Sequence, residues 1–229
     1  MKRLAIIPAR GGSKRIPRKN VKEFCGRPII AYSIEAALKS GVFDEVMVST
    51  EDAEIAEIAK KYGASVPFFR SEEASSDFAT DGVVMNEVLD RYEQMGKTFD
   101  TFAYIYACAP FITPEQLREA FRVLENSDVD SVLPLIRFSY PPQRSFVMRD
   151  GNVVWAYPEF KSTRSQDLEP FYHDIGQYYV YKTAAFKSPA GIVKRSAIFV
   201  PDELCQDIDN ESDWELAELK YKNFVLKNA

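Results

Sequence analysis

The sequence predicts an α/β fold with a doubly wound, mostly parallel sheet. Short apolar runs alternate with longer segments of helical period four times between residues 3 and 136. Because parallel strands are joined by right-handed crossovers, this alternation places helices on both faces of the sheet. A chain of 229 residues with 46% hydrophobic and 28% charged residues can bury the core of one such domain.

Each element has its own signals. Apolar runs bounded by Pro, Gly or polar residues predict strands at 3–9, 45–50, 65–69, 101–109 and 130–136. Apolar residues at helical spacing predict helices at 29–40, 51–62, 81–95 and 114–127. We expect Pro28 and Pro114 to lie in first helical turns, Gly41 to end the first helix, and Ser49 or Thr50 to cap the second.

The alternation stops between residues 137 and 172. This stretch has several prolines, aromatic residues without helical period, and the sequence "RDGN", which is typical of a hairpin turn. We therefore expect an antiparallel excursion there. The α/β pattern resumes with strands in "GQYYVYKTAAF" and "SAIFV" and a helix at 211–225. The sequence thus predicts a single domain, 1–229, that carries an insertion at 138–172.

Composition excludes several classes of protein. The net charge of -5 argues against a nucleic-acid partner. The three cysteines, Cys25, Cys108 and Cys205, are odd in number and far apart, so neither a disulfide framework nor a zinc site is indicated. No run approaches eighteen apolar residues, and the basic N-terminus has no adequate h-region. We expect no membrane partner and a cytoplasmic location.

A basic glycine loop follows the first expected strand. Residues 7–20 read "IPARGGSKRIPRKN" and combine five cations with a Gly pair and no acid. Ligands of open α/β sheets gather beyond the carboxyl ends of the strands, and exposed amides beside cations suit a polyphosphate. Neither the P-loop nor the Rossmann fingerprint is present. The alternative is a solvated basic loop whose glycines only make a turn.

Charge is also polarised along the chain. Residues 1–22 hold eight Lys or Arg and no acid, whereas residues 201–219 hold eight Asp or Glu and no Lys or Arg. An acidic C-terminal segment that crosses over a cationic phosphate loop is the arrangement that a metal-bridged triphosphate requires.

The N-terminal stretch "IIPARGGSKRIPRKNVKEFCGRPIIAYSIEAA" resembles the start of the CMP-sialic acid synthetase (acylneuraminate cytidylyltransferase) family, whose signature is A-R-G-G-S-K, P-R-K-N and G-x-P-[IL]. "VSTEDAEIAEIAKKYGASVPFFR" and "DIDNESDWELAE" extend the likeness over nearly all of the chain. The resemblance implies a nucleotide-diphospho-sugar transferase-like fold. It also implies transfer of CMP from CTP to the anomeric hydroxyl of a nine-carbon acidic sugar, with release of pyrophosphate.

The resemblance assigns roles to individual residues. It implies catalytic roles for Arg10, Lys14 and Asp209, and a site for Mg²⁺ (or Mn²⁺) at Asp207 and Asp209. The residues that it implies for nucleotide binding are Arg10, Gly11, Gly12, Ser13, Lys14, Asn20, Arg70, Asp77 and Thr80. In an extended segment, residues i and i+2 point the same way, so both aspartates can approach one ion. The alternative for this segment is a helix start capped by Asp209 or Ser212. Arg18 and Lys19 are further candidates for phosphate contact.

The sugar end departs from the pattern of sialic acid enzymes. Their Q-P-T-S-P-L-R becomes "YACAPFI" here, so a hydroxyl-reading wall turns apolar. With "RSQDL" and "YHDIGQYYV", this resembles the branch that activates pseudaminic acid, a methyl-bearing sugar. N-acetylneuraminate and legionaminate remain alternatives, as does a non-catalytic nucleotide-binding module. The residues expected to bind the sugar are Tyr106, Arg164, Gln166 and His173. The resemblance also implies a homodimer formed through residues 138–172, and a lid is the other possibility.

Overall fold

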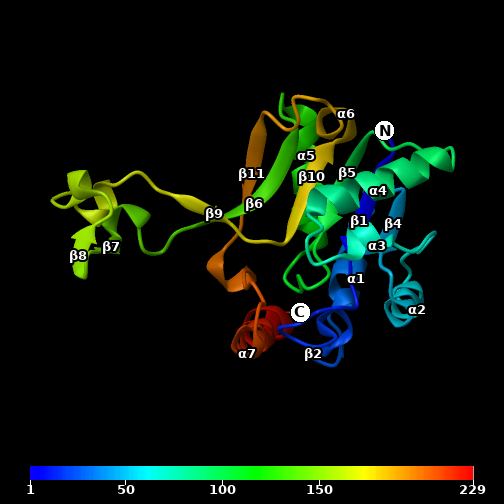
Figure 1. Ribbon diagram of the computed structural model, residues 1–229, viewed down its shortest axis with the longest axis horizontal. Helices are drawn as coiled ribbons and strands as arrows, with labels where there is room; N and C mark the ends of the chain where they lie inside the picture. The colour runs from blue at the N-terminus through cyan, green and yellow to red at the C-terminus, as the bar shows by residue number, and fades with distance from the viewer. Residues whose placement is uncertain (229) are drawn as a thin grey trace.

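The central sheet has the predicted doubly wound architecture. The computed structural model describes residues 1–228, and in them seven strands form one sheet with the order β11-β6-β10-β5-β1-β4 and β9 beside β6 (Figure 1). The strands are β1 (Arg3–Pro8), β4 (Glu45–Ser49), β5 (Thr101–Ile105), β6 (Ser131–Arg137), β9 (Tyr172–Asp174), β10 (Tyr178–Lys182) and β11 (Arg195–Phe199). β1 pairs in parallel with β4 and β5, and β11 pairs in parallel with β6. β9 and β10 run antiparallel to their neighbours. The other five strands run in one direction, so the sheet is mostly parallel.

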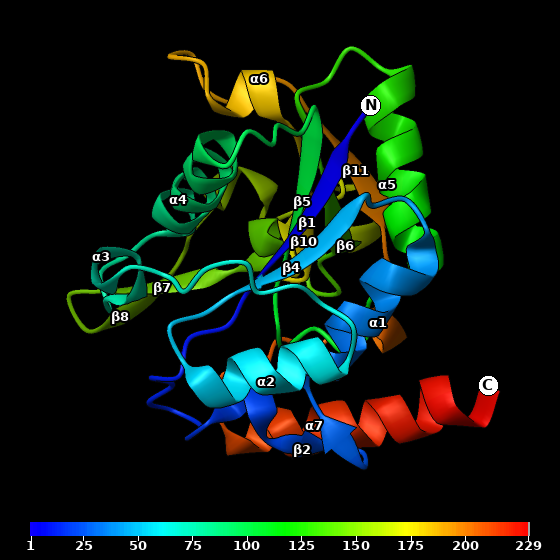
Figure 2. The same ribbon diagram turned by 90° about the vertical axis from the view of Figure 1, so that its right-hand side faces the viewer.

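Helices cover both faces of this sheet (Figure 2). The helices are α1 (Ile30–Ser40), α2 (Ala53–Lys61), α3 (Glu72–Ser75), α4 (Asp81–Gln94), α5 (Pro114–Asn126), α6 (Thr183–Phe186) and α7 (Glu211–Lys220). Ala5 and Ile7 of β1 face the core made with α1, α2 and α5, whereas Leu4 and Ile6 face the core made with α3, α4 and α6. β1 is thus buried on both faces, as expected of a parallel strand.

A third cluster joins the two ends of the chain. The short hairpin of β2 (Glu23–Phe24) and β3 (Arg27–Pro28) packs against α7, with the Phe24 and Trp214 rings 5.5 Å apart. The expected helix at 211–225 is α-helical through Lys220 and then continues as a π-helical turn. This packing brings the acidic segment before α7 close to the basic loop after β1 (Figure 1).

The insertion forms an arm that extends away from the body (Figure 1). Its hairpin consists of β7 (Phe146–Arg149) and β8 (Asn152–Trp155), joined at Asp150 and Gly151, which have φ of 50° and 76°. The predicted "RDGN" turn is therefore confirmed. The arm leaves the body after β6 and returns through β9, and these two strands pair with each other at its base.

The strand expected at 65–69 was wrong. Ser65 N donates to Val46 O at 2.8 Å and Val48 N donates to Ser65 O at 2.9 Å, which makes a single bridge beside β4. The next bond of a parallel ladder requires an N–H at Pro67, and proline has none. The next backbone hydrogen bond lies beyond the end of β4, where Arg70 N donates to Thr50 O at 2.9 Å.

Two capping expectations were also wrong. Pro28 lies in β3 rather than in the first turn of α1, because Cys25 and Gly26, with φ of 47° and 93°, form a hairpin turn just before it. The cap of α2 is Asp52, whose side chain accepts from Ile55 N at 3.0 Å. Thr50 instead accepts from Asp52 N at 3.1 Å.

The remaining helix signals hold. Pro114 begins α5 behind a Thr113 capping box, and Gly41 ends α1 with φ of 66°. The strand expected to reach residue 109 ends earlier, at Ile105. Among residues 1–228, no helix combines the length and the apolar character needed to cross a membrane.

Candidate active site

A cavity of about 480 Å³ opens where β1 and β5 end. Pro8, at the end of β1, and Tyr106, just after β5, line it. This is the edge of an open α/β sheet at which ligands bind. Nine of the predicted site residues line it: Arg10, Ser13, Lys14, Asn20, Arg70, Asp77, Tyr106, Asp207 and Asp209. The basic loop and the acidic segment therefore share one site.

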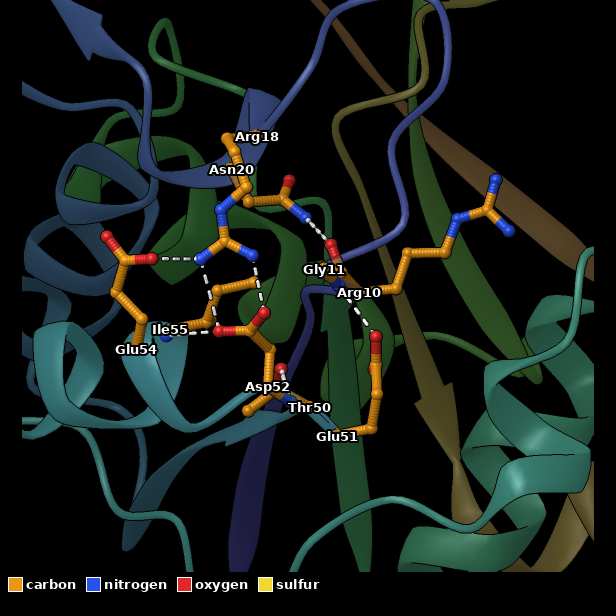
Figure 3. A network of polar contacts seen from close by, with 9 residues as sticks. All are labelled: Arg10, Gly11, Arg18, Asn20, Thr50, Glu51, Asp52, Glu54 and Ile55. Atoms are coloured by element: carbon orange, nitrogen blue, oxygen red, sulfur yellow. Dashed lines mark hydrogen bonds and ion pairs between the residues drawn. The ribbon is translucent and has the colours of Figure 1, made fainter.

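The start of the basic loop is held from behind by acidic residues (Figure 3). Gly11 N donates to Glu51 Oε1 at 2.7 Å, and a Cβ on Gly11 would lie 2.5 Å from Asp52 Oδ2. Asn20 Nδ2 donates to Arg10 O at 2.9 Å. Gly11 and Gly12 are not among the residues that line the cavity. Gly11 is thus needed for close packing against Asp52, whereas the sequence had suggested close approach to a ligand.

Two of the predicted phosphate-binding cations are paired with Asp77. Arg10 Nη1 lies 2.9 Å from Asp77 Oδ1, and Lys14 Nζ bonds Asp77 Oδ2. The Lys14 ammonium is the main cause of a lowered pKa at Asp77. Thr80, which was expected to bind nucleotide, caps α4 by accepting from Val83 N and is not among the cavity-lining residues. A bound triphosphate would compete with Asp77 for these cations.

Two polar residues that line the cavity, Arg70 and Asn20, are buried and hydrogen-bonded within the protein. Arg70 is 8% exposed, and its guanidinium donates to Ser49 Oγ at 3.0 Å and to Ser49 O at 2.5 Å. Burial lowers the pKa of Arg70. Asn20 is 9% exposed and accepts from Cys108 Sγ at 3.1 Å in addition to bonding the Arg10 carbonyl. These bonds fix both side chains before any ligand binds.

The acidic segment directs both aspartates to one side, as the metal interpretation requires. Ile208 is buried in the third cluster, and its neighbours Asp207 and Asp209 both face the cavity. Burial, together with the charge of Asp209, raises the pKa of Asp207. Arg15 Nη2 lies 2.7 Å from Asp209 Oδ1.

The helix-start alternative for these aspartates was wrong. Asn210 caps α7 through a capping box with Asp213, whose carboxylate accepts from Asn210 N at 3.0 Å. Neither Asp209 nor Ser212 is the cap, so the paired aspartates keep carboxylate oxygens for another partner.

The two aspartates suit a hard divalent cation. Mg²⁺ is commonly held by one or two carboxylates together with waters and substrate phosphates. Within residues 1–228, no group of three or more His, Cys, Asp or Glu side chains is placed to hold a metal by itself. The residues present therefore fit an ion whose remaining ligands come from a bound nucleotide.

Sequence reasoning missed Asp81 on the cavity wall. Tyr104 Oη donates to Asp81 Oδ1 at 2.8 Å, and Tyr106 Oη donates to Asp81 Oδ2 at 2.5 Å. Burial and this carboxylate raise the pKa of Tyr106. Tyr104 and Tyr106 are two residues apart at the end of a strand, so the sequence alone predicts that they point to the same face. Asp81 itself looks like an ordinary first-turn acid of α4.

The other expected sugar-binding residues lie on the arm and its return strand. Arg164 pairs with Asp167 at 2.7 Å, and the His173 ring contacts Phe138 at a tilt of 52° with ring centroids 4.6 Å apart. Arg164, Gln166 and His173 are not among the residues that line this cavity. A single chain therefore does not bring them to the basic loop.

Comparison with known proteins agrees with this geometry. A family model described as cytidylyltransferase matches residues 4–219. The chain is 42% identical to the pseudaminic acid cytidylyltransferase of Campylobacter jejuni over 97% of both chains. It is 33% identical to the CMP-N,N'-diacetyllegionaminic acid synthase of Legionella pneumophila over 95% of both.

Solved structures agree on the fold. A CMP:2-keto-3-deoxy-manno-octonic acid synthetase complexed with CTP superposes with a TM-score of 0.68 at 18% identity, covering 96% of this chain and 98% of that one. With a family model over nearly its whole length and relatives above 30% identity, the chain belongs to the cytidylyltransferase family.

Proposed function

We propose that this cavity transfers CMP from CTP to the anomeric hydroxyl of an acidic nine-carbon sugar, with pseudaminic acid as the preferred substrate. One observation carries the proposal. Arg10 and Lys14 from the N-terminal loop line the same cavity as Asp207 and Asp209 from the C-terminal segment. Cations on one wall suit a triphosphate, and paired carboxylates on another suit its metal ion.

The chemistry is a displacement at phosphorus. The sugar hydroxyl oxygen forms a bond to the α-phosphorus of CTP, the bond from that phosphorus to the pyrophosphate oxygen breaks, and the hydroxyl proton is released to solvent. Arg10 and Lys14 would hold the phosphate oxygens and neutralise the charge that the leaving pyrophosphate gains. Arg70, fixed by Ser49, would contact the cytidine end. Asp207 and Asp209 would hold Mg²⁺, which acts as a Lewis acid toward phosphate oxygens.

The choice of sugar rests on the wall after β5. Tyr106 directs its hydroxyl to Asp81, and Ala107 and Cys108 follow it in the cavity lining. Such a wall suits a methyl-bearing sugar better than a trihydroxylated tail, because a buried hydroxyl without a partner costs about 1–3 kcal/mol. The 42% identical relative acts on the same sugar by its name. Sialic and legionaminic acids are the competing substrates.

We also propose a cytoplasmic homodimer in which the arm meets a second subunit. Tyr140, Met148 and Val153 on the arm are 88%, 66% and 64% exposed, which is unusual for large apolar side chains grouped on one projection. Contact with a second chain would cover them. It would also give Arg164, Gln166 and His173 a route to the partner's cavity. The free thiols of the three cysteines suit a reducing compartment.

Pyrophosphate release tests the function. With CTP and Mg²⁺, turnover should be highest with pseudaminic acid in a panel that includes N-acetylneuraminate and legionaminate. Omission of divalent metal should abolish it, and full turnover without metal would refute the mechanism. CTP binding without pyrophosphate release from any sugar would instead indicate a nucleotide-binding module.

A matched pair of variants tests the metal role. Asp209→Asn should lower kcat by about 10² or more, as removal of a single charge-stabilising group does in other enzymes. Glu203→Gln changes an exposed carboxylate in the same acidic segment and should leave kcat unchanged. A near-normal kcat for Asp209→Asn would remove this residue from the metal site.

A further inference from the structure

Arg18 is engaged behind the basic loop, on the side of α2. Its guanidinium bonds both oxygens of Asp52, with Nη2 to Oδ1 at 3.2 Å, and it also pairs with Glu54 (Figure 3). Arg18 has the left-handed φ of 55°, which is uncommon for a side chain of this kind. The Asp52 partner is the main cause of a raised pKa at Arg18. Arg18 is not among the residues that line the cavity, whereas Arg10 and Lys14 are.

Asp52 connects Arg18 to the first residues of the loop. Its carboxylate caps α2 through Ile55 N, and its Oδ2 lies 2.5 Å from the position that a Cβ on Gly11 would occupy. The neighbouring Glu51 accepts from Gly11 N at 2.7 Å. The peptide between Arg10 and Gly11 is thus fixed on both sides, because its carbonyl accepts from Asn20 at 2.9 Å.

We infer that Arg18, Asp52 and Glu51 form a positioning clamp for the basic loop. The clamp holds the Arg10–Gly11 peptide against the start of α2, so that the Arg10 side chain emerges on the cavity side. Figure 3 shows the Arg10 guanidinium directed away from Glu51 and Asp52. The Arg18 guanidinium lies between Asp52 and Glu54. Arg18 therefore acts through Asp52 and Gly11, without touching the nucleotide. This inference rests on the proposed cytidylyl transfer.

The surrounding charges support a positioning role for Arg18, distinct from the phosphate-binding role proposed for Arg10 and Lys14. A guanidinium that bonds two carboxylates has little net attraction left for a phosphate, and Asp52 and Glu54 would repel a triphosphate brought to the same place. A planar guanidinium that makes two hydrogen bonds to one carboxylate fixes the orientation of both groups, and this can hold a loop in one conformation. Small displacements of a positioned group can lower a rate by about 10²-fold.

The sign of one charge change separates the clamp from direct phosphate contact. Asp52→Asn keeps a good helix cap but removes the negative charge that grips Arg18. If Arg18 is part of a clamp, this variant should bind CTP several-fold more weakly and lower kcat/KM about 10-fold. If Arg18 contacts phosphate, freeing it and deleting an acid should make CTP bind more tightly. Glu57→Gln, an exposed charge change on the same helix, is the matched control and should change neither quantity.

A double-mutant cycle gives a second readout. Arg18→Gln and Asp52→Asn break the same pair, so the double variant should lose no more than the worse single variant, whereas independent roles would add. Arg18→Lys should recover part of the loss, since an ammonium pairs with Asp52 but lacks the planar guanidinium. A structural role alone would lower the thermal midpoint and leave the CTP affinity of the folded protein unchanged.

Calorimetric CTP binding keeps this inference separate from the proposed function. Binding is measured without sugar, so wild-type protein that binds CTP but turns over no sugar would end the proposed transfer and still test the clamp. Tighter CTP binding by Asp52→Asn, or additive losses in the cycle, would overturn the clamp even if every sugar is turned over. Should Asp52→Asn fail to fold, Arg18→Gln and Arg18→Lys decide: a several-fold loss of CTP affinity in Arg18→Gln that Arg18→Lys partly recovers supports the clamp, and CTP affinity left unchanged by Arg18→Gln overturns it.

Discussion

The ammonium group of Lys19 donates a hydrogen bond to the backbone carbonyl of Ile208, the residue between Asp207 and Asp209. Lys19 belongs to the basic loop, and Ile208 belongs to the acidic segment before α7. The bond therefore joins the two oppositely charged parts of the chain at the cavity. Lys19 was considered for phosphate contact on its charge, and the structure shows that it also holds the acidic segment.

Loss of this bond should impair catalysis. Lys19→Met keeps the length of the side chain, removes the donor, and leaves the paired aspartates less firmly placed, so kcat/KM should fall about 10-fold. The Mg²⁺ concentration for half-maximal rate should rise with it. Lys60→Gln disrupts an exposed ion pair with Glu57 on α2 and serves as the control. Unchanged rate and metal dependence in Lys19→Met would show that the bond positions nothing.

The two loop glycines should differ sharply. A Cβ on Gly11 would meet Asp52 Oδ2 at 2.5 Å, whereas a Cβ on Gly12 would have no heavy atom within 4 Å. Gly11→Ala should therefore lower the thermal midpoint and the rate, while Gly12→Ala should leave the midpoint unchanged. Differential scanning fluorimetry and pyrophosphate release compare the pair. Equal midpoints would mean that the loop does not rest against Asp52.

Asp77 should act as a competitor of the triphosphate. It pairs with Arg10 and Lys14, and exposed ion pairs of this kind are weak and screened by salt. Asp77→Asn should then tighten CTP binding by as much as about 5-fold at low salt, with a smaller gain at high salt. Asp90→Asn on α4 is the control. Weaker CTP binding by Asp77→Asn would instead favour the contact with nucleotide that the family resemblance implies.

Glu45 should make folding stability depend on pH. Burial alone would raise its pKa, but hydrogen bonds from Tyr92 (2.6 Å), Lys97 (3.0 Å) and Ser65 (3.0 Å) lower it below the ordinary value of 4.5. The unfolded chain thus binds more protons than the folded one just below that pH, so this contribution is present above it and is lost on acidification.

Glu45→Gln isolates this effect. The wild type should be more stable than the variant near pH 7, and the gap should narrow as pH falls through about 4.5 and below. Urea unfolding at several pH values measures it. A gap that stays constant with pH would show that the carboxylate charge does not contribute.

The arm should be required for dimer formation. Val153 and its cross-strand partner Met148 are exposed on the hairpin, so Val153→Glu should oppose burial of this surface and give a monomer by light scattering. If arms complete the partner's site, the variant should keep CTP binding and lose turnover of the sugar. Asn152→Asp at the turn is the control. A dimer that survives Val153→Glu would place the contact elsewhere.

Most of the fold could be predicted from the sequence because the signals for its helices, strands and turns are local. Alternating apolar runs, the Thr113–Pro114 helix start and the Asp150–Gly151 turn each act within a few residues. The missed strand shows the limit of such signals, since "SVPFF" has the composition of a strand while one missing N–H at Pro67 ends its ladder.

The sequence predicted which charged residues belong to the candidate site, but it did not predict which residues pair with one another there. Sequence placed Arg18 beside Lys14 in one basic run, yet Lys14 faces the cavity and Arg18 faces α2. Which carboxylate each cation meets depends on tertiary packing. Arg164 likewise pairs with Asp167 on the arm and does not line the cavity.

The pairing of β6 with β9 makes the arm a separable module. Leu135, Ile136 and Arg137 pair with Asp174, His173 and Tyr172, so the entry and exit of the arm are stitched together before Gly176 reaches the cavity wall. Insertions, deletions or exchanged hairpins beyond that seam should therefore leave the cavity lining in place. Changes beyond the seam can therefore alter what the arm contacts while the loop after β1 and the segment before α7 keep their places at the cavity.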